Sequence, residues 1–398
     1  MAVHYSTRAM MPTMRSRWPA LVVVFITRIS MGVQFQSIAS VAPLLVADLH
    51  LSYAQLGTLV GLYLLPGVAL ALPGGWLGRR FGERRAVVWS LALMLAGGLV
   101  SAAGGSFATV AAGRVISGGA AVLMNLLVIK LTADWFAEHE MATAMAVVLT
   151  AWPVGLGLAV ATLGAVATAS SWRVAIVVAS ATAAVGLALM ALVFRPAPTR
   201  SEPGSASLAA ADQALAVSSG AAWGAFNASV IVVVAFAPAM LVARGTSLGQ
   251  AGFLVGLAIW TTIVSVPLGG LASDRIGRPN VAIVAGCLAA VALLLALPTM
   301  PAASVGLLLL GVVVGAAPGP LTSLLPRALP PERLAVGLGL SYTVYYVVVA
   351  LAQPLAGMVR DHTGDPAAPI RVAAAAMAAT ILGLIVFRWI ERRRSRTR

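Results

Sequence analysis

The sequence predicts an all-α, polytopic membrane protein in which twelve transmembrane helices form two pseudo-symmetric six-helix halves. Three observations lead to this prediction. The composition is too apolar for a water-soluble domain, apolar runs of about 20 residues recur along the chain, and a segment of the first half is repeated in the second half.

The composition identifies lipid as the solvent for much of the chain. Hydrophobic residues make up 60% and charged residues 10%, with a mean hydropathy of +0.96, whereas soluble domains carry about 25% charged residues. The net charge of +14 would suggest nucleic acid as the partner of a soluble protein. Here the arginines stand mostly in short loops between apolar runs, so we expect the lipid bilayer and no nucleic acid. The single cysteine, Cys287, excludes an intramolecular disulfide and a cysteine-based metal site.

Twelve apolar runs are each long enough to cross a bilayer. An α-helix rises 1.5 Å per residue, so about 20 apolar residues span a hydrocarbon core of ~30 Å. The runs are too long and too uniformly apolar for the alternation of barrel strands. The expected spans are 20–45, 53–73, 86–105, 107–130, 142–167, 173–194, 222–242, 250–271, 280–300, 303–325, 335–358 and 370–390.

Basic residues predict the orientation of these spans. Arginines gather in the first 18 residues, in alternate loops and in the tail WIERRRSRTR (389–398). The remaining loops and their edges offer only Arg173, Arg244, Arg360 and Arg371. Because Lys and Arg favour the cytoplasmic side, we expect both termini in the cytoplasm and the protein in the cell membrane, the inner membrane of a bacterium.

A polar segment and a repeat divide the chain into two halves. Residues 195–221, rich in Pro, Ser and Ala, are typical of a linker between an N-terminal half at 1–194 and a C-terminal half at 222–398. GLYLLPGVALALPGGWLGRRFGERR (61–85) matches GLAIWTTIVSVPLGGLASDRIGRPN (256–280) at an offset of 195. Two related halves predict a binding site at their interface, near the midplane of the membrane.

The turn after the second expected span resembles the signature of the major facilitator superfamily, roughly G-x-L-a-D-r-x-G-r-r. It reads GWLGRRFGERR at 75–85, and GLASDRIGR at 270–278 is a degenerate copy. In the family an Asp of this motif helps to latch the halves on the cytoplasmic side. Arg79 stands at that position in the first copy, so the latch is expected from Asp274 alone. The resemblance implies motif or gating roles for Gly75, Arg79, Arg80, Gly82, Arg84, Gly270, Asp274, Arg275, Gly277 and Arg278.

Three further features resemble anion-transporting members of the superfamily. AGRVISGGAA (112–121) is similar to the arginine-bearing fourth-helix motif of proton-linked and anion members. An arginine in the first helix is found in organic-anion and sugar-phosphate members, where an Asp often precedes it, but Thr27 precedes Arg28 here. YYVVVALAQPLAGMVRDHTGD (345–365) resembles the eleventh helix of cyanate-permease-like members.

Only three ionisable side chains are expected inside the spans, and all are cationic: Arg28, Arg114 and Lys130. The twelve acidic residues and four histidines fall in loops or at span ends. An arginine at the centre of a membrane helix costs about 2.5–3.5 kcal/mol on insertion scales, so Arg28 should face water or a partner. Because arginine keeps its charge and can hold an anion with two donors, we expect an anion site with Arg28 as anchor and Arg114 as support.

Four other side chains are predicted to line this site. Arg114 and Asn125 are three helical turns apart and therefore share a face of the fourth span. Gln36 lies at the edge of the face that carries Arg28, and Tyr342 and Tyr345 offer hydroxyls from the eleventh span.

Structural alternatives stay open for the same residues. Arg28 can instead bond carbonyls of a neighbouring helix, and Arg114 can belong to a structural or gating network. The tyrosines can be ordinary packing residues. Lys130 either faces the site or anchors its helix at the membrane interface.

The sequence therefore predicts a monomeric secondary transporter of a small organic or inorganic anion that works by alternating access. No nucleotide-binding loop, metal cluster or nucleophile triad indicates an enzyme, a cofactor or a metal. Because no membrane carboxylate or histidine is expected, anion exchange ranks ahead of proton coupling. The main alternative is a proton-driven drug or metabolite exporter; such members often carry a membrane carboxylate and a GP motif in helix five, where WPVGLG (152–157) stands here. A non-transporting receptor is a third possibility.

Overall fold

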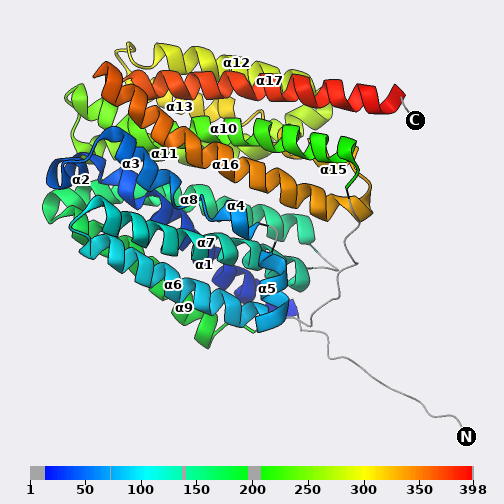
Figure 1. The fold of residues 1–398 in the computed structure, drawn as a ribbon, viewed down its shortest axis with the longest axis horizontal. Helices are drawn as coiled ribbons and strands as arrows, with labels where there is room; N and C mark the ends of the chain where they lie inside the picture. The colour runs from blue at the N-terminus through cyan, green and yellow to red at the C-terminus, as the bar shows by residue number, and fades with distance from the viewer. Residues whose placement is uncertain (1–13, 72, 137–139, 196–207, 397–398) are drawn as a thin grey trace, which may run out of the picture.

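The computed structural model describes residues 14–71, 73–136, 140–195 and 208–396, and every regular element within these ranges is an α-helix. The helices lie alongside one another in a single bundle (Figure 1). The all-α, polytopic fold predicted from the sequence is confirmed.

The helices before residue 195 form the N-terminal half: α1 (Met14–Ser40), α2 (Ala42–Leu49), α3 (Tyr53–Gly61), α4 (Gly67–Leu70), α5 (Gly74–Phe81), α6 (Glu83–Ala103), α7 (Phe107–Trp135), α8 (Met141–Ala169) and α9 (Trp172–Leu192). Those after residue 208 form the C-terminal half: α10 (Ala210–Ala243), α11 (Leu248–Ile276), α12 (Pro279–Ala296), α13 (Ala303–Val314), α14 (Pro318–Thr322), α15 (Leu324–Ala328), α16 (Pro331–Thr363) and α17 (Ala368–Arg396). The start of α1 and the end of α17 lie at the same end of the bundle, which we call the termini end; α2 lies at the opposite, far end (Figure 1).

Eleven segments of the described chain are long and apolar enough to cross a membrane. The exception among the twelve expected spans is the second, which the structure divides. A turn over 62–66 separates α3 from α4, where Pro66 is followed by Gly67. Proline supplies no backbone N–H and clashes with the preceding turn, so a continuous helix is disfavoured there. The tenth span is also divided into α13, α14 and α15, with one break over 315–317 just before Pro318 and another at Ser323.

The seventh span begins earlier than expected. Its helix α10 starts at Ala210, inside the segment predicted as a linker, and carries Asp212 in its first turn. The Asp212 carboxylate is buried and ion-paired at 2.7 Å with Arg333 of α16 and at 2.7 Å with Arg394 of α17. A helix start tied in this way to two other helices is part of the bundle, and residues 196–207 of the expected linker lie outside the described residues.

The internal repeat has a structural counterpart at the turns that follow α5 and α11. Gly82, between α5 and α6, has φ = 83°, and Gly277, at the end of α11, has φ = 67°. Such left-handed conformations favour glycine. The two glycines that align at an offset of 195 therefore share a positive φ, while their ψ angles differ, at 124° for Gly82 and 15° for Gly277.

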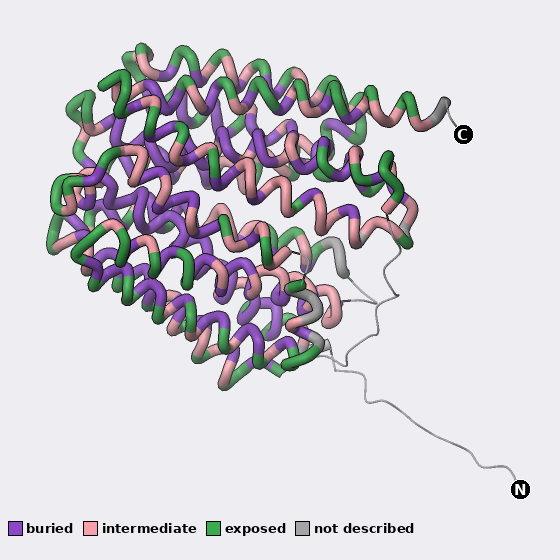
Figure 2. The backbone as a smooth tube through the Cα atoms, viewed as in Figure 1, coloured by how far each residue is buried: buried purple, intermediate pink, exposed green. Residues whose placement is uncertain are grey.

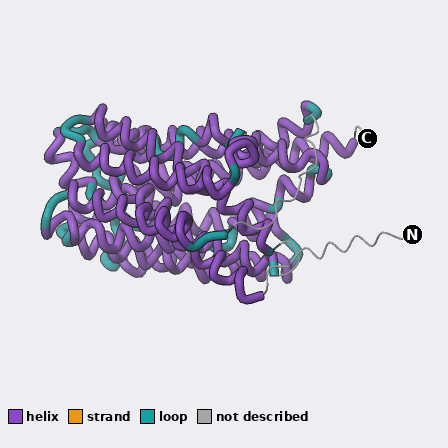
Figure 3. The backbone as a smooth tube through the Cα atoms, turned by 90° about the horizontal axis from the view of Figure 1, so that it is seen from below, coloured by secondary structure: helices purple, strands orange, loops and turns teal. Residues whose placement is uncertain are grey.

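The two halves pack most closely toward the far end. There α3 lies against α16 and α8 against α11. A methyl group on Gly57 would collide with the Gln353 carbonyl, and one on Gly252 with the Val160 carbonyl. At the termini end the ribbons of the two halves splay apart (Figure 3). The bundle is thus closed between the halves at one end.

Burial follows the pattern of a membrane protein. Buried residues run through the middle of the bundle, while exposed residues follow its outer faces (Figure 2). Many of the exposed residues are large and apolar, including Leu192, Trp89 and Leu382. These side chains require an apolar solvent, as a hydrocarbon core provides.

Candidate functional site

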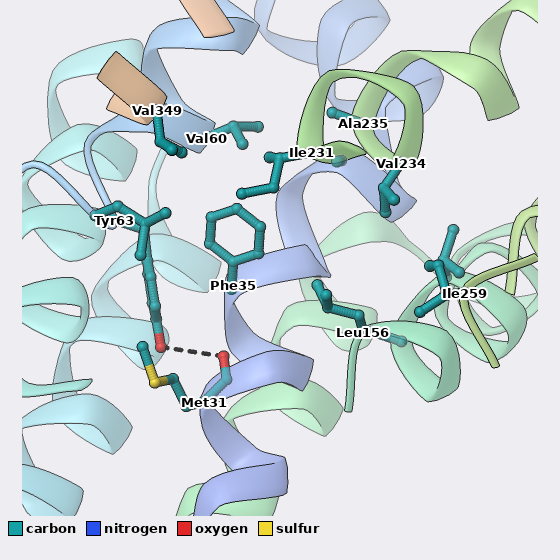
Figure 4. Packing of buried hydrophobic residues seen from close by; sticks show 14 of the residues in the cluster. Met31, Phe35, Val60, Tyr63, Leu156, Ile231, Val234, Ala235, Ile259 and Val349 are labelled. Carbon is teal, nitrogen blue, oxygen red and sulfur yellow. Dashed lines mark hydrogen bonds between the residues drawn. The ribbon is translucent and has the colours of Figure 1, made fainter. Parts of the chain in front are cut away.

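Phe35 of α1 marks the centre of the interface between the halves. Val60 and Tyr63 approach its ring from the N-terminal half, and Ile231 and Val349 from the C-terminal half (Figure 4). Its ring also lies 5.2 Å from that of Trp152, between centroids. This apolar cluster thus joins side chains of both halves around Phe35.

Arg28 lies two helical turns before Phe35 on the same face of α1, on the side of the termini end. It is buried, with 7% of its surface exposed. Its Nε donates to Oδ1 of Asn125 on α7 at 2.9 Å, and its Nη1 donates to the carbonyl of Val148 on α8 at 2.7 Å. No described residue accepts a hydrogen bond from its Nη2, so part of the guanidinium retains donors for another partner.

A cluster of aromatic residues faces Arg28 from the other half. Tyr342 and Tyr346 of α16 lie near Arg28 across the interface. Tyr342 packs edge-to-face on Tyr345 at 5.8 Å between ring centroids, and Tyr345 stacks on Trp223 of α10 at 6.4 Å. Tyr342 is 42% exposed. Among the described residues none bonds the hydroxyls of Tyr342, Tyr345 and Tyr346, so these hydroxyls keep their hydrogen-bonding capacity.

Arg114 has no such spare capacity. Its Nε donates to the carbonyl of Leu59 at 2.9 Å, Nη1 to that of Gln34 at 2.7 Å and Nη2 to that of Phe35 at 2.9 Å. Its guanidinium also lies 4.4 Å from the ring centre of Tyr63. The side chain is only 2% exposed. Arg114 thus joins α7 to α1 and α3. This agrees with the alternative in which Arg114 belongs to a structural network.

A small polar cavity lies beside Arg114, within the N-terminal half. Its volume is about 10 Å³, close to the space that one water molecule needs. The lining side chains include Gln34, Ser37, Ser117 and Ser180, and the side-chain oxygen of Gln34 has no partner among the described residues. The cavity can hold water but is too small for an organic substrate.

The other predicted site residues are distributed as follows. Asn125 shares a face with Arg114, but it bonds Arg28. The amide nitrogen of Gln36 donates across the interface to the carbonyl of Val234 on α10 at 3.1 Å, and its buried oxygen has no described partner. Lys130 lies toward the termini end, ion-paired with Glu83 and with Asp134, the latter at 3.0 Å. The structure therefore brings Arg28, Asn125 and the tyrosines together and places Lys130 apart.

The motif residues occupy the two corresponding turns. Gly75 and Arg79 belong to α5, and the side chain of Arg79 lies outside the described part of the chain. Arg84 donates to the carbonyls of Met190 and Ala191 at the end of α9. In the first copy the carboxylate belongs to Glu83, four residues after Arg79, and it pairs with Lys130 of the neighbouring helix α7. In the second copy Asp274 lies 3.8 Å from Arg327. Arg80, Gly270, Arg275 and Arg278 are exposed or half-buried around the same turns.

Two contributions to the site could not be read from the sequence. The carbonyl of Val148 carries no signal in the chain, because any residue supplies one. Trp223 stands at the start of an apolar run with no charged neighbour, so only its contact with Tyr345 reveals its place. No group of His, Cys, Asp and Glu among the described residues could hold a metal ion.

Comparisons with known proteins agree with this architecture. The family model described as Major Facilitator Superfamily matches residues 24–237 and 218–398. Comparison with curated proteins gave no match. Solved structures with the same fold include a bacterial homolog of the human lysosomal transporter Spinster in an inward-facing, occupied conformation, at a TM-score of 0.75 and 17% identity over 97% of this chain and 98% of that one. The nucleoside transporter NupG matches at a TM-score of 0.74 and 14% identity over 95% and 99% of the two chains.

The fold and the apolar helices define a multi-pass membrane transporter. The chain belongs to the Major Facilitator Superfamily. Members of this superfamily are transporters rather than enzymes, in keeping with the sequence prediction.

Proposed function

We propose that the protein transports a small organic or inorganic anion, with Arg28 as the residue that holds it. The observation that carries this proposal is the incomplete bonding of the Arg28 guanidinium at the interface of the halves. The buried carboxylates of the described chain stand at helix ends with cationic partners of their own, Glu83 with Lys130 and Asp212 with Arg333. Neither is available to neutralise Arg28, so a mobile anion is the simplest counter-charge.

The geometry favours a ligand with a compact anionic group. Asn125 and Val148 hold one side of the guanidinium and orient it. The Nη2 hydrogens and the second hydrogen of Nη1 have no acceptor among the described residues, and together they form a fork that matches two oxygens of a carboxylate. Tyr342 and Tyr346 stand opposite and can donate hydroxyl hydrogens to the same group. A single uncompensated charge favours a monovalent ligand over a large dianion.

Transport follows from the arrangement of the two halves. With the halves closed at the far end and apart at the termini end, the site would be reached from the termini end. Basic residues gather at that end, which we therefore assign to the cytoplasm, in the inner membrane of a bacterium. Rocking of the halves about the central site would expose Arg28 to the other side. The absence of a mid-membrane carboxylate from the described spans favours exchange of anions over proton-driven export.

A thermal-shift screen of the purified protein tests the proposal. The probes are the sodium salts of acetate, lactate, benzoate, cyanate, nitrate and phosphate, at constant ionic strength. At least one anion should raise the Tm of the wild type in a saturable manner, because a ligand that binds only the folded state stabilises it. The same anion should have no effect on Arg28→Gln. Equal stabilisation of the wild type and Arg28→Gln by every anion would refute the role of Arg28.

A further inference from the structure

A groove on the outer face of the N-terminal half lies outside the transport site. It is formed by α5, α6 and α7 near the termini end and has a volume of about 480 Å³, within the range of ~300–1,000 Å³ that is usual for ligand pockets. Its lining includes Leu77, Phe81, Arg85, Trp89, Leu93 and Leu123. The groove therefore has the size of a ligand site, and no helix of the described residues fills it.

The apolar part of the groove is a continuous stripe. Arg85, Trp89 and Leu93 follow one another at intervals of four residues, which places them on one face of α6. The eight steps from Arg85 to Leu93 correspond to about 12 Å along the helix axis. Phe81 is 56% exposed, Trp89 69% and Leu93 51%. Such an elongated apolar recess on a membrane-facing surface matches the shape of an acyl chain.

The charge at one end of the stripe is also unmatched. Arg85 is exposed in the first turns of α6, and it has no hydrogen bond or ion pair among the described residues. The nearby carboxylates Glu83 and Asp134 are both paired with Lys130. A cation beside an exposed tryptophan at the end of a membrane helix is placed at the level of lipid headgroups. Arg85 therefore offers its donors to a negatively charged group at that level.

We propose that this groove binds one anionic phospholipid. The lipid phosphate pairs with Arg85, and one acyl chain lies along Phe81, Trp89 and Leu93. A neutral lipid would leave the Arg85 charge unmatched, and free phosphate would leave the apolar stripe uncovered. Both features together select a molecule with an anionic head and a long apolar tail. This site is independent of Arg28 and of the transported substrate.

Native mass spectrometry of the purified full chain tests the proposal. The probes are dioleoylphosphatidylglycerol and dioleoylphosphatidylcholine, which share acyl chains and differ in headgroup charge. The wild type should bind the first phosphatidylglycerol more tightly than phosphatidylcholine. Since one basic residue near a membrane surface contributes about 1 kcal/mol to anionic lipid binding, Arg85→Gln should weaken that first binding event roughly fivefold and leave phosphatidylcholine unchanged.

Two matched variants complete the experiment. Arg392→Gln removes one exposed charge from α17 of the other half and should keep the wild-type preference. Leu93→Trp fills the apolar stripe and should weaken the first binding of both lipids. Equal affinity of the wild type for the two lipids would overturn the proposal. An equal loss of phosphatidylglycerol affinity in Arg85→Gln and Arg392→Gln would also overturn it. Loss of phosphatidylglycerol binding on addition of inorganic phosphate would identify an anion site and not a lipid site.

Discussion

At the scale of single residues, Arg28 and Arg114 differ in what their guanidinium groups bond. Both are nearly inaccessible cations in membrane helices. Arg114 donates to three backbone carbonyls. Arg28 donates to one carbonyl and one side-chain amide oxygen, and its Nη2 has no acceptor among the described residues. The sequence predicts that each must have a partner, because an unpaired charge in a membrane is costly. It does not reveal the partners, since carbonyls of distant helices look alike in any sequence.

Replacing Arg114 should affect stability more than ligand binding. Arg114→Gln would leave carbonyls of Leu59, Gln34 and Phe35 buried without their donors, at roughly 1–3 kcal/mol for each that finds no new partner. We expect a clearly lower Tm in detergent. The anion that stabilises the wild type should still raise the Tm of the variant. A variant with wild-type Tm and no anion response would place Arg114 in the binding site instead.

Asp48 should contribute a pH dependence to stability. Its carboxylate accepts hydrogen bonds from Trp172 Nε1 at 2.9 Å and from Arg173 Nη1 at 2.8 Å. The bond from Trp172, followed by that from Arg173, lowers the pKa of Asp48 below its usual value, which is about 3.9 in unfolded chains. The folded state thus favours the ionised form, so the stabilisation is complete above the unfolded pKa and is lost as the pH falls through the folded pKa.

Thermal melts between about pH 7 and about pH 3 in the same buffer series check this expectation, because these limits bracket the pKa of Asp in unfolded chains. The Tm of Asp48→Asn should fall less steeply at the acidic end than that of the wild type. Asp274→Asn, which alters a largely exposed carboxylate 3.8 Å from Arg327, should keep the wild-type steepness. Coincident curves for the wild type and Asp48→Asn would show that the bonds from Trp172 and Arg173 do not matter for folding.

At the scale of elements, most helices follow from hydropathy, and the exceptions follow from proline and from tertiary contacts. Pro66 and Gly67 stand in the apolar run 53–73, where hydropathy alone predicts one continuous helix and the structure divides it into α3 and α4. The early start of α10 cannot be predicted from the sequence. An aspartate in a polar segment is typical of a loop, and the ion pairs of Asp212 with Arg333 and Arg394 come from other helices. The paired turns at Gly82 and Gly277, by contrast, are visible as a repeat.

The N-terminus of α3 is held by the opposite half, and this contact should stabilise closure of the far end. Asp361 of α16 accepts from the backbone N–H groups of Tyr53 at 2.8 Å and Ala54 at 2.7 Å, and Arg360 lies over the Tyr53 ring. A carboxylate at a helix N-terminus satisfies free N–H groups and interacts favourably with the helix dipole. Asp361→Asn should therefore destabilise the closed far end by about 1–2 kcal/mol.

Distances between spin labels at Ala47 and Ala302, in a Cys287→Ala background, measure this closure, because both positions lie near the far end in different halves. Asp361→Asn should increase the ratio of molecules with a longer label-to-label distance to those with the shorter one. The increase should be roughly tenfold for each 1.4 kcal/mol by which the closed far end is destabilised. Asp365→Asn is the matched control, since Asp365 bonds Ala367 and Arg371 within its own half. Equal changes in the two variants would argue against a specific role of the Asp361 contact.

At the scale of the whole molecule, closure at one end and a partly bonded cation at the centre are the features that connect fold to transport. Glycines such as Gly57 and Gly252 allow helices of opposite halves to approach closely at the far end. The sequence predicts two halves and a central site from the repeat and the linker. It leaves open which end is closed, because that depends on helix tilts that no local pattern encodes.

The central claim is that Arg28 holds the transported anion. Its most direct test is uptake of the radiolabelled anion identified by thermal shift into proteoliposomes, with and without the same anion inside. The wild type should show uptake that internal anion accelerates. Arg28→Lys should be impaired, since lysine lacks the planar fork, and Arg28→Gln should lose roughly tenfold or more, as expected for a lost hydrogen-bonded charge. Uptake by Arg28→Gln at the wild-type rate would contradict the account.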